Sequence, residues 1–146
     1  MSLSETAFGA FAFVAGIIPA SILTDGFDAA ARLPLPRGWA YIQPEVTLVT
    51  YMFLHGDVWH LLGNMLFLWV FGDNVEDRMG HLGYLLFFIA SGVVASLIQG
   101  FMDPLSVVPV LGASGAVAGV LGAYIVWYPN ATVNVVIPFF ILIFIP

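Results

Sequence analysis

The stretch "VVPVLGASGAVAGVLGAY" at residues 107–124 has no charged residue and places one serine, Ser114, among glycines and alanines. A run this apolar predicts a helix that is buried in protein or in lipid. Pro109 and Gly112 indicate that this helix begins near Ser114. Its small residues have two interpretations: they form a stripe on which another helix packs, or they leave space around a nucleophilic Ser114. Taken alone, the stretch favours the packing stripe.

The composition of the whole chain indicates a membrane protein. Of 146 residues, 61% are hydrophobic and only 8% are charged, whereas about a quarter of the residues of soluble domains are charged. Three basic residues against nine acidic ones give a net charge of −6, which argues against binding to nucleic acid or to an anionic lipid surface. The absence of cysteine excludes disulfides and thiolate chemistry.

Apolar segments and polar breaks divide the chain into candidate membrane spans. A bilayer crossing needs roughly 20 apolar residues in a helix, and four segments approach that length. We therefore predict an all-α, polytopic membrane helix bundle within a single domain, with an extramembrane loop at residues 24–46. The short apolar segment 7–23 is left undecided between a span and an interfacial helix. The four predicted spans are residues 58–71 (with apolar character reaching back to about residue 47), 82–102, 110–128 and 132–146, and polar turns are predicted at 72–81 and 102–109.

Polar side chains inside apolar spans are costly and usually face the interior of the bundle or a wet cavity. His60 and Asn64 are four residues apart and therefore share one helix face, and His55 precedes them near the mouth of the same helix. Hydrogen bonding between helices and a catalytic role are about equally supported by this spacing. With the free N–H groups at the start of the helix at Ser114, these side chains would supply donors for an oxyanion. A base is missing, because no histidine follows Ser114 in the sequence.

The segments "FLHGDVWHLLGNMLFLWVFGDNVEDRMGHLGYLLFFIASG" (53–92) and "GASGAVAGVLGAY" (112–124) closely resemble the rhomboid family of intramembrane serine proteases. Three motifs carry the resemblance: a histidine and an asparagine four residues apart, an ExR turn that closes the span, and a GxSG that opens a later one. The resemblance implies a core of six helices, of which about four are present here. It also implies a water-filled cavity and transmembrane protein substrates. No cofactor or metal is expected, because two histidines five residues apart without a third ligand make a poor zinc site.

The resemblance also implies roles for individual residues. Ser114 would be the nucleophile, flanked by Gly112 and Gly115, while His60 and Asn64 would stabilise the oxyanion together with the Ser114 N–H. His55 would be structural, as would Glu76 and Arg78 in an ion-pairing turn. The base would be a histidine on the sixth helix, which this chain lacks.

The chain departs from the family pattern at its two ends. It is expected to begin after the first helix of the family and to end within the fifth, so residues 1–146 would form a partial domain that is inactive alone. The alternative function is a catalytically inactive rhomboid-like protein that binds transmembrane helices; a channel is disfavoured because the tail has no charge. The expected location is a prokaryotic inner or plasma membrane, which the chain would cross several times.

Overall fold

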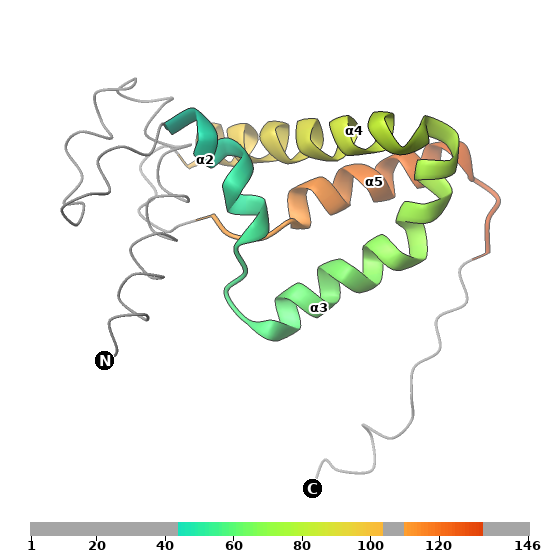
Figure 1. Cartoon of the computed structure of the whole chain (residues 1–146), viewed down its shortest axis with the longest axis horizontal. Helices are drawn as coiled ribbons and strands as arrows, with labels where there is room; N and C mark the ends of the chain where they lie inside the picture. Colours follow the sequence, from blue (N-terminus) through green and yellow to red (C-terminus); the bar gives the residue numbers. More distant parts are fainter. Residues whose placement is uncertain (1–43, 104–109, 133–146) are drawn as a thin grey trace, which may run out of the picture.

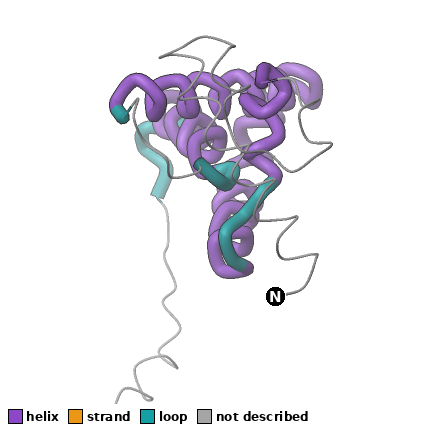
Figure 2. The backbone as a smooth tube through the Cα atoms, turned by 90° about the vertical axis from the view of Figure 1, so that its left-hand side faces the viewer, coloured by secondary structure: helices purple, strands orange, loops and turns teal. Residues whose placement is uncertain are grey.

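The computed structural model describes residues 44–103 and 110–132 of the chain. All elements in this part of the chain are helical, which confirms the predicted all-α class (Figures 1 and 2). The apolar segment 7–23, residues 24–43 of the predicted loop and almost all of the predicted span 132–146 lie outside the described residues. The elements are α2 (Pro44–Thr50), the 3-10 helix η3 (Tyr51–Phe53), α3 (Val58–Phe67), the π-helix η4 (Leu68–Gly72), α4 (Asp73–Met102) and α5 (Ser114–Trp127).

The helix α3 begins where its sequence supplies a cap. Asp57 has extended backbone angles, and its side chain accepts a hydrogen bond from the backbone N–H of His60 at 2.9 Å. Such a cap satisfies one of the N–H groups that have no partner at a helix start and typically contributes about 1 kcal/mol. The polar residues "HGD" at 55–57 therefore have a structural role, because they follow the end of η3 and supply the cap of α3.

The predicted polar turn at residues 72–81 is wrong in its extent. From Val58 the chain stays helical through the π-turn η4 and through the charged residues that follow, and it bends at Gly80, which has φ +73° and ψ 161°. Only glycine adopts this region of backbone space readily. The corner is therefore a single residue, and α4 in Figure 1 includes a short arm before the bend.

The run Val58–Met102 is the one helix among the described residues that is long and apolar enough to cross a membrane. Since Gly80 breaks it, each of its two arms comes close to the roughly 20 residues that a crossing needs. The helix α5 is apolar but has only 14 residues. The number of four spans therefore stays a prediction.

The helix α5 lies in the angle between α3 and α4 and runs alongside α4 (Figure 1). Small residues make this approach possible. A Cβ atom added to Gly119 would lie 2.5 Å from Cβ of Ser91, and one added to Gly115 would collide with Cβ of Ala95. Both helices thus present small residues four positions apart, a pattern that lets helices pack closely in membranes. The packing interpretation of the stripe is confirmed for Gly115 and Gly119.

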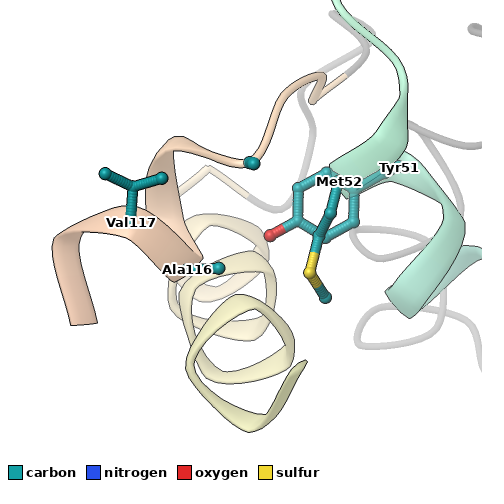
Figure 3. Packing of buried hydrophobic residues seen from close by; sticks show 5 residues of the cluster. Tyr51, Met52, Ala116 and Val117 are labelled. Carbon is teal, nitrogen blue, oxygen red and sulfur yellow. The ribbon is translucent and has the colours of Figure 1, made fainter. Parts of the chain in front are cut away.

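The core lies where η3 meets the start of α5. Tyr51 and Met52 reach from η3 toward α4 and α5 (Figure 3), and each is at most 2% exposed. The phenol of Tyr51 donates a 2.7 Å hydrogen bond to the backbone carbonyl of Gly92 on α4. The cluster consists of Tyr51, Met52, Ala113, Ala116 and Val117.

The helix α3 has the reverse of the polarity pattern of a soluble protein. Its large apolar side chains are outward, with Trp59 82% exposed, whereas Asn64 is only 6% exposed. Asn64 is the one buried residue of α3. Apolar side chains outside and a polar one inside are what a lipid environment favours, since hydrocarbon solvates the former and excludes the latter.

Candidate functional site

Gly112 forms the sharp bend that leads into α5. Its φ is +102°, and its N–H donates to the backbone carbonyl of Tyr51 at 3.2 Å. A Cβ atom at this position would lie 2.5 Å from Cε1 and 2.8 Å from Nε2 of His60. The imidazole of His60 thus occupies the space where a side chain would project, so both the backbone angle and the neighbouring ring require glycine. The bend brings the GxSG segment against α3.

Ser114 is the first residue of α5, at the position that the sequence predicts, and it is exposed. A residue at the start of a helix has a backbone N–H without an intrahelical partner, and the helix dipole favours negative charge there. Beside it is a cavity of about 130 Å³. A chemical group bound in this cavity would lie next to Ser114. The cavity is lined by Tyr51, Ala95, Ser96, Gln99, Val110, Gly112, Ser114 and Gly115.

Three side chains form a polar cluster on the inner side of α3. Nδ2 of Asn64 lies 3.0 Å from Nε2 of His55, at hydrogen-bonding distance. The rings of His55 and His60 meet edge to face, with centroids 5.3 Å apart. Because the His60 ring also abuts Gly112, the cluster extends from α3 to the bend before Ser114. His55, expected to be structural, is the hydrogen-bond partner of Asn64.

Not all the predicted site residues come together. His60 and Asn64 do not line the cavity beside Ser114. Among the described residues, which include all three histidines, none hydrogen-bonds to the Ser114 hydroxyl. Gly112 is the link, since it lines the cavity and also abuts the His60 ring. Nor do the described residues contain any group of three or more side chains that could hold a metal ion.

Glu76 and Arg78 lie at the Gly80 corner. They do not pair with each other, and each contacts a different partner. The carboxylate of Glu76 pairs with Nδ1 of the exposed His81. The guanidinium of Arg78 lies 5.0 Å from the ring centroid of Tyr128 and 5.8 Å from that of Trp127, both at the end of α5. The ion pair that the resemblance implies within this turn is thus replaced by cation–π contacts that fasten the corner to α5.

Tyr51 is a residue of the site that the sequence did not indicate. Its phenol holds α4, its carbonyl accepts from Gly112, and its side chain lines the cavity beside Ser114. Its partners are 41 and 61 residues away in sequence. The only local signal is a tyrosine in an otherwise apolar run, which usually seeks a partner for its hydroxyl when buried.

Comparison with known proteins gives one consistent result. The family profile described as "Rhomboid domain" matches residues 43–146. The chain is 33% identical over 114 residues to "Rhomboid protein 1, mitochondrial" of Saccharomyces cerevisiae, a match that covers 68% of this chain and 33% of the yeast protein. It is 40% identical over 76 residues to "Rhomboid protease GluP" of Bacillus subtilis, covering 52% of this chain and 14% of that protein. No solved structure gives a significant match.

A third relative is "Rhomboid-like protein 11, chloroplastic" of Arabidopsis thaliana, 42% identical over 71 residues, which are 49% of this chain and 25% of that protein. The chain therefore spans about a third or less of the length of these three relatives. Because they are mitochondrial, chloroplastic and bacterial, they do not support a specifically prokaryotic location. Members of the family are membrane proteins, in agreement with the outward apolar surface of α3. The profile match over residues 43–146, together with the GxSG bend and the histidine–asparagine pair of α3, shows that this chain belongs to the rhomboid family.

Proposed function

We propose that this chain carries the nucleophile and the oxyanion-binding half of an intramembrane serine endopeptidase. The observation that supports it most is the bend at Gly112, which abuts the ring of His60 and leads directly into α5, where Ser114 is exposed beside a cavity. The substrates in this proposal are transmembrane segments of other membrane proteins. Such a function requires polar groups at membrane depth, and Asn64 is one of them.

In the proposed reaction, Oγ of Ser114 attacks the carbonyl carbon of a peptide bond while its proton passes to a base. The carbonyl oxygen becomes an oxyanion, which the N–H of Ser114, the imidazole of His60 and the carboxamide of Asn64 stabilise. Collapse of this intermediate breaks the C–N bond, the base returns the proton to the leaving amine, and water then hydrolyses the acyl-enzyme. The base in this proposal is a histidine outside residues 1–146.

The nucleophile is tested by labelling with a fluorophosphonate, which reacts with activated serines. We expect the native-length protein that carries these residues to be labelled in membranes and Ser114→Ala to abolish the labelling. Ser91→Ala is the matched control, because it changes a serine of α4 that packs against Gly119 away from the bend. Labelling that persists in Ser114→Ala, or a folded protein that takes no label, would contradict the proposal and favour a non-catalytic binder of transmembrane helices.

Residues 1–146 alone are expected to cleave no transmembrane reporter substrate at a measurable rate in liposomes. Loss of one member of a serine-protease triad leaves only roughly 10³- to 10⁴-fold acceleration over the uncatalysed reaction, which is far too slow to detect for a peptide bond. Ser114-dependent cleavage by this chain alone would refute the expectation. It would show that His60 or a second copy of the chain supplies the base.

A further inference from the structure

Asn64 has a buried carboxamide with one hydrogen-bond partner among the described residues. It is 6% exposed, and its Nδ2 lies 3.0 Å from Nε2 of His55, which comes from the loop before α3. A carboxamide nitrogen only donates, so Nε2 of His55 has to accept. The ring of His55 must then be neutral and carry its proton on Nδ1.

From this geometry we infer that His55 is a positioning residue for Asn64. It accepts one of the two N–H bonds of the carboxamide, stops the amide from rotating, and leaves the second N–H free for the oxyanion. Only one part of the inference rests on the proposed function, namely that the second N–H of Asn64 binds the oxyanion. The hydrogen bond and the tautomer of His55 belong to the resting protein and are testable without catalysis.

The surroundings of His55 favour this role over that of a simple packing residue. Its ring meets the ring of His60 at an interplanar angle of 74°, so one histidine contacts both of the proposed side-chain donors. The turn that carries His55 is fixed on both sides, because Leu54 N–H donates to the Tyr51 carbonyl and Asp57 caps α3. A donor that is already oriented needs no reorganisation when charge develops, and this is the main advantage of a preorganised oxyanion site.

The first test is the tautomer of His55 in the 146-residue chain, read from the ¹⁵N chemical shifts of its ring nitrogens in lipid nanodiscs near neutral pH. We expect the Nδ1–H form, with a shift of Nε2 that changes when Asn64→Leu removes the donor. The ring of His81, which is 97% exposed, serves as the internal reference, because its shifts should not respond to Asn64→Leu. An Nε2–H tautomer, or shifts of His55 that ignore Asn64→Leu, would overturn the inference.

The second test is a double-mutant cycle on kcat in the native-length protein. His55→Phe keeps a ring beside His60 and removes the acceptor, and we expect it to lower kcat roughly tenfold with little change in KM. Asn64→Ala should lower kcat by roughly 10²-fold or more, as the loss of an oxyanion donor does. If His55 acts through Asn64, His55→Phe costs nothing further in the Asn64→Ala background. His55→Gln, whose amide oxygen can accept, should recover most of the loss, and His81→Phe should have no effect.

These outcomes separate the inference from the proposed function. Equal effects of His55→Phe in both backgrounds would show a purely structural role and overturn the inference alone. If Ser114 takes no label while His55 shows the Asn64-dependent tautomer, the proposed function fails and the assigned hydrogen bond stands.

Discussion

Replacing Gly112 with alanine is expected to destabilise the protein for two reasons, a backbone conformation that disfavours a side chain and a collision with a neighbouring ring. The backbone at Gly112 has φ +102°, and holding a residue with a side chain there typically costs about 1–3 kcal/mol. The added Cβ would also lie 2.5 Å from the His60 ring, which would have to move. In the proposed enzyme, displacing this ring removes an oxyanion donor, so we expect kcat to fall by roughly 10²- to 10³-fold as well.

Gly80→Ala is the matched control for Gly112→Ala. Gly80 also has a positive φ, +73°, but a Cβ added there would meet nothing within 4 Å. It therefore measures the backbone cost without the ring contact. Thermal unfolding in detergent should show a larger loss of Tm for Gly112→Ala than for Gly80→Ala, and only Gly112→Ala should lower activity. Equal losses of Tm with unchanged activity would mean that the His60 contact does not matter.

Replacing Gly119 with leucine is expected to separate α5 from α4. The first atom of the new side chain would lie 2.5 Å from Cβ of Ser91, which is fixed to the backbone of α4 and cannot rotate away. Overpacking of this kind typically costs about 1–3 kcal/mol and occasionally more. In lipid the consequence is severe, because close packing, and not exclusion from water, is what holds two apolar helices together.

Gly122→Leu is the control on the same helix, since a Cβ at Gly122 would have nothing within 4 Å. Thermal unfolding in detergent measures the effect of both variants. The Tm should fall clearly for Gly119→Leu and stay near that of the parent for Gly122→Leu. A Gly119→Leu protein with unchanged Tm would show that α4 and α5 do not depend on this contact.

The start of α5 could be predicted because its signals are local. Pro109 and Gly112 precede an uninterrupted apolar run, and the helix begins at Ser114 as they indicate. The bend at Gly112 has φ +102°, a conformation for which glycine is the default residue. The small-residue stripe was predictable for the same reason, because its spacing alone places Gly115 and Gly119 on one face of a helix.

The corner between α3 and α4 could not be predicted well. Four of the six residues at 73–78 are charged, which is typical of a turn. These residues nevertheless remain helical, and the chain bends only at Gly80. What overrides the local preference is tertiary contact: Arg78 lies over the rings of Trp127 and Tyr128, and the hydroxyl of Tyr128 donates to the Asn74 carbonyl. The π-turn at Leu68–Gly72 could not be predicted either, because no pattern in the sequence marks it.

The sequence predicts which residues form the candidate site, but it does not predict their contacts. The spacing of His60 and Asn64 places them on one face of α3, but it does not reveal that Asn64 is bonded to His55 and that His60 abuts Gly112. The partner of a side chain depends on its rotamer and on the angle at which neighbouring helices cross. No repeating pattern in the sequence reports either of these. The phenol of Tyr51, whose partner is 41 residues away, illustrates the same limit.

The reversed polarity of α3 has a consequence for how such proteins diverge. Trp59 on α3 and Trp69 on the adjoining η4 are outward, whereas Asn64 is buried, so one face is suited to lipid and the other carries polar groups of the candidate site. A change in the acyl-chain length or sterol content of the membrane alters the surroundings of the first face and leaves those of the second unchanged. Substitutions that adapt the protein to another membrane can therefore be confined to the outward face and leave the inner polar groups in place.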